Sequence, residues 1–509
     1  MHISPVNAER GAFNGRSKVA LAVLAALAFG LVDPTISVDG AVVRSRTSVD
    51  PIPRPAPSGD VACDGVVVQP GTDIQAAIDA RPTGATFCLM PGVHRLLRGL
   101  RPKEDQRFIG EPGAVVSGSK VVPSWTLEGG FWVAAGQTQE SRPAGVCQPD
   151  SYKGCRHAEG VYLDNRNLRQ VTDLAELSSG EFFFDYPSDR IYLADDPTGH
   201  TVETSVASEM FDAWGVHGVE VRGLVVEKFA NPASNPALNS RDEWVVTGNE
   251  IRLNHGIGVA VGSRGVVRGN YVHDQGQLGM SGYGSVGALV ENNEIAFNNT
   301  DGFEINWEAG GTKWVKTKGL TVRGNWVHDN RGHGLQTDID NVGTTYVRNR
   351  VEDNGGVGIL HEISYRAKIH HNYVARNGSL SNGGLDGSGI LVASSSNVEV
   401  YANRLERNAD GLGLKQDARG SGSRGRHVSK NFYAHHNVVV MCVGHTGAVR
   451  SAGVGSGIFG KRNNRFEKNR YRLGSPGGTW WHWRNSPRSQ QEWKGYGHDR
   501  RGRFKGASC

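Results

Sequence analysis

The chain has 509 residues, a formal net charge of +5 and 69 glycines, and 38% of its residues are hydrophobic. Beyond the N-terminus no segment is long and apolar enough to predict a membrane span. A net charge this small over this length does not indicate a nucleic-acid-binding protein. We therefore expect a large folded chain with many tight turns, no nucleic-acid partner and little helix.

Residues 1–40 have the pattern of a secretory signal peptide. The basic residues at its start are Arg10, Arg16 and Lys18. They precede an apolar stretch at 19–32, shorter than the roughly 20 residues that a membrane span needs. A cleavage site is expected near Val38-Asp39-Gly40. The pattern predicts a secreted, extracellular protein without stable membrane insertion after cleavage, and a retained N-terminal membrane anchor is the alternative.

A proline-rich linker is predicted at 41–60, where the text DPIPRPAPSGD favours an extended chain. Residues 61–120 are predicted to form an N-terminal cap and the first coils of a repeat. Ile74, Ala77 and Ile78 lie on one stripe of a short helix, and Thr86–Leu89 is expected to be a strand. Such a helix would cover the open end of a stack of strands.

Residues 121–210 have a different sequence pattern, in which aromatic residues alternate with polar residues and turns. The aromatic residues are Trp125, Phe131, Trp132, Tyr162, Phe182, Phe183, Phe184, Tyr186 and Tyr192. Alternation at period two is typical of strands with one buried face. We predict an antiparallel β excursion beside the early coils.

Residues 211–460 contain a repeat of asparagine, glycine and aliphatic residues. Each copy opens with an asparagine and a short alternating stretch, as in Asn270 and the following Tyr-Val-His. The opening asparagines are Asn249, Asn270, Asn293, Asn325, Asn349, Asn372, Asn403 and Asn437. A second asparagine follows five residues later in most copies, at Asn254, Asn298, Asn330, Asn354, Asn377 and Asn408. Asparagine tolerates left-handed backbone geometry, and its amide can bond to the same residue of the next copy.

A glycine then starts a second short strand in each copy. These predicted strands begin after Gly258, Gly302, Gly334, Gly358, Gly389 and Gly411. A unit this short cannot bury a core alone, so copies must stack, and three short strands per coil predict an all-β, right-handed parallel β-helix. Three copies are longer than the rest and must carry extra loops, and in two of them the extra residues fall near 307–318 and 378–387. Loops on one face of a solenoid commonly form its binding face.

Residues 461–509 are rich in tryptophan and basic residues. The tryptophans are Trp480, Trp481, Trp483 and Trp493. We expect a C-terminal cap over the last coil, and the alternative is a surface on which sugars stack. The basic stretch 461–472 would be the solvated outside of this cap, or would hold a polyanionic glycan.

The chain has six cysteines, and an exported protein can keep them as disulfides. Proximity in sequence and the need to fasten the chain ends predict three pairs, Cys63–Cys88, Cys147–Cys155 and Cys442–Cys509. No C-x-x-C spacing indicates a zinc site.

The repeats, together with IQAAIDARPTGATFCLMPG near the front, resemble the secreted right-handed parallel β-helix proteins of the pectate-lyase-like superfamily. The resemblance extends from about Cys63 onward. The segments INWEAGGTKWVKT, GHGLQTDIDN and GILHEISYRAKIHHN are similar to a recurrent block in secreted bacterial β-helix proteins. The superfamily is dominated by polysaccharide lyases and glycoside hydrolases, so the resemblance implies a polysaccharide substrate by analogy. The catalytic set of the polygalacturonases is absent as a set, and only RGHG at Arg331–Gly334 echoes part of it.

Aligning the second strands on their glycines predicts which side chains point outward. The outward residues are Glu304, Asn306 and Glu308 in one coil, Gln336, Asp338 and Asp340 in the next, then Leu360, Glu362 and Ser364. The neighbouring inward residues include Trp307 and His361. With coils about 4.8 Å apart, Asn306, Asp338 and Glu362 are expected in one row, and Glu308 and Asp340 in the next. Like charges at that spacing raise each other's pKa, which favours a functional role over a plain surface.

Two kinds of chemistry fit this row. The first is hydrolysis, in which one carboxyl group stays protonated and donates to the leaving oxygen. The second is β-elimination at a Ca²⁺ site made by Glu308, Asp338, Asp340 and Glu362. Its base would be Lys313, Lys415 or Arg366, and His361 would join the acid–base residues only if a bulge turned it outward. The structural alternative pairs the carboxylates with these cations.

From the sequence we predict a secreted, monomeric protein that cleaves a polysaccharide containing uronic acid. Its catalytic candidates are Asp338, Asp340, Glu362, His361, Lys313 and Lys415. Its candidate substrate-binding residues are Glu304, Asn306, Trp307, Glu308, Gln336 and Arg366. The competing interpretation is a glycan-binding or cell-surface protein without catalysis.

Overall fold

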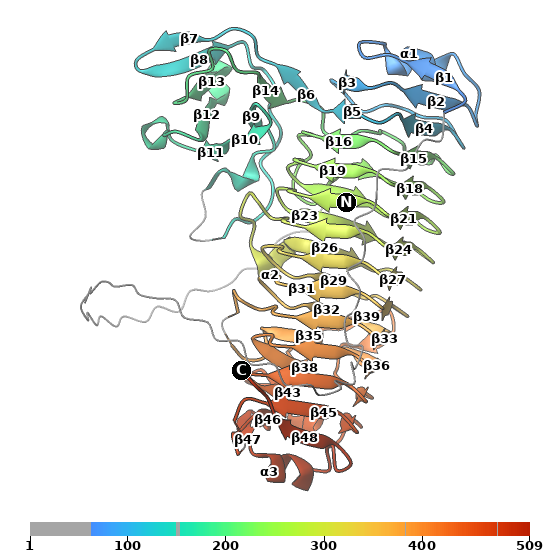
Figure 1. Cartoon of the computed structure of the whole chain (residues 1–509), viewed down its shortest axis with the longest axis vertical. Coiled ribbons are helices and arrows are strands. Elements are labelled where there is room, and N and C mark those ends of the chain that lie inside the picture. Colours follow the sequence, from blue (N-terminus) through green and yellow to red (C-terminus); the bar gives the residue numbers. More distant parts are fainter. Residues whose placement is uncertain (1–62, 149–152, 382, 476) are drawn as a thin grey trace, which may run out of the picture. The chain divides into compact units, whose positions relative to one another are not determined.

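The computed structural model describes residues 63–148, 153–381, 383–475 and 477–509, all within one compact unit. The predicted signal peptide and linker, residues 1–60, lie outside the described residues. The described chain winds into stacked coils of short parallel strands (Figure 1). Within these ranges no helix combines the length and apolar character needed to cross a bilayer.

Most coils contribute one strand to each of three sheets, in which neighbouring strands run parallel except for the last pair of the third sheet. The first sheet contains, in order, β1 (Val66–Val68), β2 (Thr86–Leu89), β4 (Arg107–Gly110), β15 (Glu220–Arg222), β18 (Val245–Thr247), β21 (Val266–Arg268), β24 (Leu289–Glu291), β27 (Thr321–Arg323), β30 (Thr345–Val347), β33 (Tyr365–His370), β36 (Ser396–Tyr401), β41 (Tyr433–His435) and β44 (Arg465–Glu467). The second contains β3 (Gly92–Arg95), β5 (Ala114–Ser117), β16 (Val225–Glu227), β19 (Glu250–Arg252), β22 (Tyr271–His273), β25 (Glu294–Ala296), β28 (Trp326–His328), β31 (Arg350–Glu352), β34 (Tyr373–Ala375), β37 (Arg404–Glu406), β42 (Val438–Met441), β45 (Arg470–Leu473) and β48 (Arg503–Gly506). The third contains β17 (Pro236–Asn239), β20 (Ile257–Ala260), β23 (Leu278–Tyr283), β26 (Gly310–Val315), β29 (Leu335–Asp338), β32 (Ile359–Glu362), β35 (Ser388–Ala393), β38 (Asp410–Gln416), β43 (Thr446–Arg450), β46 (Trp481–Trp483) and β47 (Ser486–Arg488).

The core is a column of aliphatic side chains inside the coils. In a three-residue strand such as β18, only the middle residue, Val246, points inward and is fully buried. The in-register partners of Val246 are Val221 and Val267, so identical positions stack from coil to coil. This stacking explains the period-two alternation, and the predicted all-β parallel β-helix is confirmed.

Two asparagine ladders hold the turns between the sheets. In the first, the side-chain amide of Asn270 donates to Asn293 Oδ1 over 3.0 Å, and Asn293 repeats this to Asn325 over 2.9 Å. In the second ladder Gln275 takes the asparagine position of its coil and accepts from Asn254 over 3.0 Å. Because these side chains are buried, they satisfy backbone groups that water cannot reach.

Both ends of the stack are covered. Helix α1 (Ile74–Asp79) buries Ile74 and Ile78 against the first coil, as the helical stripe predicted. At the other end, α3 (Gln490–Gly495) buries Trp493, which stacks on Trp481 with ring centroids 6.1 Å apart. The four tryptophans of this region are at most 9% exposed, so they form the core of a cap and offer no open face for a sugar. The three predicted disulfides, Cys63–Cys88, Cys147–Cys155 and Cys442–Cys509, are all present.

Between β5 and β15 the chain leaves the coils and forms two small sheets with their own core. One contains β6 (Ser119–Val121), β9 (Val161–Leu163), β10 (Arg166–Asn167) and β14 (Val202–Ser205). The other contains β7 (Thr126–Glu128), β8 (Phe131–Ala135), β11 (Arg169–Val171), β12 (Glu181–Asp185) and β13 (Arg190–Leu193). Pairing is antiparallel throughout, except that β11 runs parallel to β12. Short 3-10 turns lie at Lys153–Arg156, Leu174–Glu176, Tyr186–Ser188 and Ser456–Phe459, and a two-stranded hairpin pairs β39 (Ser421–Gly422) with β40 (Gly425–Arg426).

One predicted strand is wrong. Residues after Gly302 form a turn and the short helix α2 (Ile305–Glu308), and the third-sheet strand of this coil begins only at Gly310. The side chain of Asn299 holds the turn by accepting from Phe303 N over 2.8 Å. Phe303 also makes a bridge to Cys147 of the excursion, a tertiary contact that overrides the local pattern.

Candidate functional site

The outward face of the third sheet carries two rows of side chains that the register fixes. In the first row Lys313, Gln336 and Leu360 lie side by side, because Trp314 pairs with Thr337 and Gln336 with Leu360. In the second row Asp338 of β29 is the neighbour of Glu362 of β32, one residue beyond the pair Thr337 and His361. The predicted adjacency of Asp338 and Glu362 is therefore present.

A cleft of about 200 Å³ opens over this face. Its lining residues are Ile305, Asn306, His333, Gln336, Gly356, Val357, Leu360, Glu362, Leu380, Ser381, Asp386, Leu391, Ala393, Lys415, Asp417 and Arg419. The floor is apolar, because Leu360, Leu391 and Ala393 belong to one buried cluster. The 378–387 loop lines the cleft through Leu380, Ser381 and Asp386, as the longer copy predicted. The other charged lining residues are Glu362, Lys415, Asp417 and Arg419.

Glu362 has the chemistry of a proton donor. Burial raises the pKa of its carboxyl group, and the negative charge of Asp338 adds to this effect. Arg419 pairs with Glu362 and acts in the opposite direction, but its side chain is 43% exposed and its charge is partly screened. We take the raised pKa as the net result, so Glu362 holds its proton to a higher pH than an ordinary glutamate.

Asp338 is not among the cleft-lining residues, and it acts on Glu362 through its charge from the adjacent strand. Lys313 lies 3.0 Å from Asp338 Oδ2, and the same ammonium group donates to the carbonyl of Trp307 over 2.7 Å. This pair is the structural alternative expected from the sequence for Lys313. Lys415 lines the cleft and pairs with Asp386 over 2.7 Å.

Two further side chains offer hydrogen bonds to a ligand. His333 Nδ1 accepts from the backbone N–H of Val357 over 3.0 Å, and burial beside Lys313 lowers the pKa of His333 to about 4. The neutral ring therefore carries its hydrogen on Nε2, which makes His333 a donor. Gln336 is only 5% exposed, and its Oε1 has no hydrogen-bond partner among the described residues. A buried acceptor left unpaired in a cleft wall is a mark of a binding position.

His361 points inward, as alternation predicted, and no bulge turns it out. Its Nδ1 lies 2.7 Å from Thr337 Oγ1, and burial lowers the pKa of the ring to about 3. A fully buried, neutral histidine with this partner is a core residue. The position of His361 therefore does not support the predicted catalytic role.

The other predicted residues are dispersed. Glu304 caps α2 by accepting from Asn306 N over 3.1 Å, and Glu308 accepts from Ser234 over 2.7 Å. Trp307 packs against the cluster around Phe303 and the Cys147–Cys155 disulfide. Arg366 is an exposed residue of the first-sheet strand β33, outside the cleft lining. Of the substrate-binding set, only Asn306 and Gln336 line the cleft.

The expected row of Glu308 and Asp340 is wrong, because α2 replaces the predicted strand. Asp340 instead accepts from Ser423 N over 2.8 Å, under the β39–β40 hairpin. In the described part of the chain, no three His, Cys, Asp or Glu residues group in a way that would hold a metal ion. The four carboxylates do not fit the predicted Ca²⁺ site, and calcium dependence stays an untested prediction.

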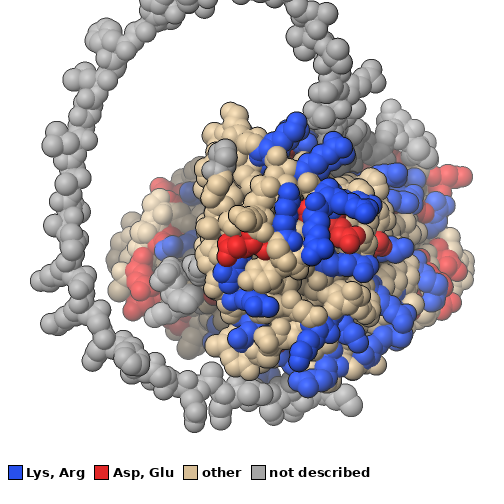
Figure 2. Space-filling model, turned by 90° about the horizontal axis from the view of Figure 1, so that it is seen from below, with Lys and Arg blue, Asp and Glu red and all other residues tan. Residues whose placement is uncertain are grey.

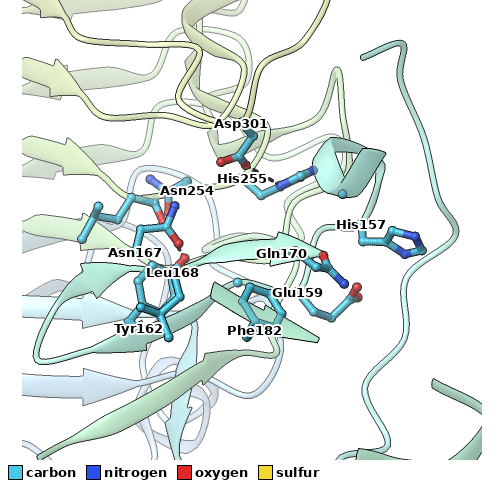
Figure 3. A pocket seen from close by; sticks show the side chains of 13 residues that line it. His157, Glu159, Tyr162, Asn167, Leu168, Gln170, Phe182, Asn254, His255 and Asp301 are labelled. Carbon is cyan, nitrogen blue, oxygen red and sulfur yellow. Dashed lines mark hydrogen bonds and ion pairs between the residues drawn. The ribbon is translucent and has the colours of Figure 1, made fainter. Parts of the chain in front are cut away.

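A second, smaller cavity lies between the excursion and the coils (Figure 3). His255 and Asp301 point toward one another there, with Nδ1 and Oδ2 2.9 Å apart. Tyr162 and Glu159 come from the excursion side. The cavity measures only about 20 Å³, which is room for a water molecule and far too little for a sugar ring. Of these two cavities, the cleft over the third sheet is the candidate site, because it combines room for a sugar with a carboxyl group of raised pKa.

Comparison with known proteins indicates a right-handed coil. The sequence model of the family described as right handed beta helix region matches residues 237–386. This chain is a right-handed parallel β-helix protein. The right-handed parallel β-helix fold inferred from its repeats is confirmed.

Several solved structures are similar to this β-helix protein. The complex of XylC with xylose has a TM-score of 0.62 and 16% identity, covering 78% of this chain and 80% of that chain. The A-module of the mannuronan C-5 epimerase AlgE6 from Azotobacter vinelandii has a TM-score of 0.42 and 13% identity, covering 86% and 94%. The polygalacturonase from Erwinia carotovora ssp. carotovora has a TM-score of 0.39 and 7% identity, covering 87% and 93%. At 16% identity the likeness to the XylC structure shows the fold alone. No curated protein sequence matches the chain.

Four ionisable residues that line the cleft of the β-helix protein were missed as site candidates by sequence reasoning: His333, Asp386, Asp417 and Arg419. RGHG at Arg331–Gly334 was the available signal for His333. Asp417 continues the outward alternation of β38 past Lys415. Asp386 and Arg419 lie on loops outside the strands, where alternation gives no information.

Proposed function

We propose that this protein hydrolyses a polysaccharide in the cleft over the third sheet, with Glu362 as the general acid. The observation that carries the proposal is the raised pKa of Glu362, a cleft-lining carboxyl group with an acidic neighbour on the adjacent strand. Glycoside hydrolysis requires two carboxyl groups in different environments, one of them protonated near neutral pH.

The second carboxylate in this proposal is Asp417. It lines the same cleft, and its negative charge also contributes to the raised pKa of Glu362. Asp417 accepts from the hydroxyl of Ser451, which fixes its orientation. In the reaction Glu362 gives its proton to the leaving glycosidic oxygen, while Asp417 takes a proton from the attacking water. Asp338 acts through Glu362 as a positioning residue.

A substrate containing uronic acid suits the cations of the cleft. Lys415 and Arg419 both line it, and a sugar carboxylate could replace Asp386 or Glu362 as their partner. His333 and Gln336 would bond sugar hydroxyls. The XylC structure contains a sugar, which supports starting with sugar polymers, although that protein shares only the fold.

β-Elimination is the second candidate, because Lys415 is an amine within the cleft. It would abstract the proton beside a uronate carboxylate, and the glycosidic oxygen would leave as a double bond forms in the sugar. The product then absorbs ultraviolet light, whereas hydrolysis yields reducing ends without absorbance.

The test is a panel of uronic-acid polymers and neutral glycans, with Ca²⁺ or with chelator, read by ultraviolet absorbance and by reducing ends. We expect reducing ends without absorbance, and a loss of about 10²–10⁴-fold in the Glu362→Gln variant. The control is Glu243→Gln, an exposed glutamate paired with Arg264 far from the cleft. Absorbance that needs Lys415 would replace hydrolysis by elimination. Glycan binding without either product, unchanged in Glu362→Gln, would identify a binding protein.

A further inference from the structure

The C-terminal end of the chain concentrates positive charge. Residues 461–509 contain 13 Lys and Arg but 3 Asp and Glu, a net +10, whereas the preceding 460 residues carry −5 of the total of +5. One of the three acids, Asp499, is fully buried and accepts from Tyr471 over 2.8 Å. Figure 2 views the molecule from this end, where blue Lys and Arg side chains cover much more of the visible face than red Asp and Glu side chains do.

Several of these cations occupy strand positions at which other coils of the second sheet pair a cation with a carboxylate. Along most of the second sheet, outward cations sit beside carboxylates. Arg252 lies 2.7 Å from Glu250, and the residues at the same strand positions of β31 and β37, Arg350–Glu352 and Arg404–Glu406, also form ion pairs. In β45 and β48 both positions are cationic, because Arg470 pairs in register with Arg503, and Arg472 with Lys505.

These four side chains, which we call the C-terminal cation rows, lack compensation. All four are exposed, and none has a carboxylate partner or side-chain hydrogen bond within the described ranges. Like charges directly opposite on neighbouring strands are destabilising. Strand β48 is nevertheless held firmly, since Phe504 stacks on Tyr471 and the Cys442–Cys509 disulfide fastens the tail behind it.

A groove of about 480 Å³ adjoins the rows. It is lined by Arg376, Glu406, Arg407, Val440, Arg472, Lys505, Gly506, Ala507 and Ser508. Arg472 and Lys505 thus belong both to the rows and to the groove. Strands lie about 4.8 Å apart and alternate residues about 7 Å apart, so the charges form a regular flat array. Such an array matches a chain of regularly spaced anions better than one small anion.

We propose that the C-terminal cation rows and this groove bind an acidic polysaccharide, a linear polymer with carboxylates on successive sugars. This surface is separate from the cleft and would hold the protein on a polymer irrespective of cleavage. Three disulfides favour an oxidising compartment outside the cell, where acidic polymers are mainly glycans. Nucleic acid is the competing polyanion and is an outcome of the test.

The test compares three forms of the full chain on immobilised polygalacturonate, dextran and double-stranded DNA. The test variant combines Arg470→Gln, Arg472→Gln, Arg503→Gln and Lys505→Gln. The control combines Lys318→Gln, Arg348→Gln, Lys368→Gln and Lys430→Gln, four exposed cations elsewhere with the same change in net charge. Binding is measured at low and high salt, and the thermal midpoint checks folding.

We expect polygalacturonate binding to weaken at least about tenfold in the test variant but not in the control, with less salt dependence. None of the three forms should bind dextran. The thermal midpoint of the test variant should not fall, because like-charge repulsion is removed. Equal losses in both variants, no binding by the wild type, or tighter binding of DNA than of polygalacturonate would each overturn the proposal. None of these results depends on cleavage, so the proposed hydrolysis could fail independently.

Discussion

Replacing Asn330 by alanine should test how much the asparagine ladder stabilises the coils. The side-chain amide of Asn330 donates to the carbonyls of Ile295 and His328, each over 3.0 Å, and to Asn354 Oδ1 over 2.8 Å. Its Oδ1 accepts from Asn298 N over 3.2 Å and from Asn298 Nδ2 over 2.8 Å. All of this lies in the interior, since Asn330 is 1% exposed.

The magnitude follows from what the alanine leaves unpaired. Asn354 Oδ1 keeps the backbone N–H of Asn330, and Asn298 Nδ2 keeps a 3.4 Å contact to Val272 O. The buried N–H of Asn298 loses its acceptor, which costs about 1–3 kcal/mol. The carbonyls of Ile295 and His328 also lose the amide group that donated to them, which adds to this cost. We expect the free energy of unfolding to fall by about 3 kcal/mol.

Urea unfolding followed by tryptophan fluorescence measures this change. The matched control is Asn167→Ala, an exposed asparagine of β10, which should change stability by no more than about 0.5 kcal/mol. If the loss of stability in Asn330→Ala were as small as in the control, the turns would be held by the aliphatic column alone. The ladder would then be a consequence of stacking and not a cause of it.

Three further predictions concern buried ionisable side chains. Lys228→Met should lower the free energy of unfolding, as measured by urea unfolding, by about 3 kcal/mol. The buried ammonium group of Lys228 pairs with the Glu203 carboxylate, and Arg95 is the cation partner of Glu203 that would remain among the described residues. Glu362 has a raised pKa when folded, so its stabilising contribution is complete below the unfolded pKa and is lost as pH rises through the folded pKa. Glu362→Gln should therefore raise the thermal midpoint near neutral pH, with the gain vanishing in acid; an unchanged midpoint at neutral pH would contradict the raised pKa. His361 stays neutral because its pKa falls to about 3, so His361→Gln should leave the shape of the pH–rate profile unchanged between about pH 5 and 9.

The parts of the fold that were predictable are those with local causes. Alternation in strands such as β18 and the asparagine at each turn repeat in every coil, and neither depends on distant contacts. The row of Asp338 and Glu362 was predictable for the same reason. In both coils the second strand starts at the same distance after the ladder asparagines, Asn330 and Asn354.

The strand predicted after Gly302 is absent because of a tertiary contact. The interval from Asn298 to Gly302 has the same length as in the neighbouring coils, so the local signal for a strand was intact. The bridge from Phe303 to Cys147 and the packing of Trp307 under the excursion withdraw this segment from the sheet. The partner residues lie more than 100 positions away, beyond the reach of periodicity. The same limit applies to Arg419, which reaches Glu362 from a loop after β38.

The cleft and the C-terminal cation rows should act independently because of how a solenoid is stabilised. Each coil contacts mainly the coils next to it, so a substitution in β45 or β48 changes packing locally. Glu362 lies in β32, several coils away and on a different sheet. Neutralising the rows should therefore weaken attachment to a long polymer without altering cleavage of a short one. Loss of both together would mean that a single continuous path binds the substrate, and that the rows are part of the cleft's own substrate site.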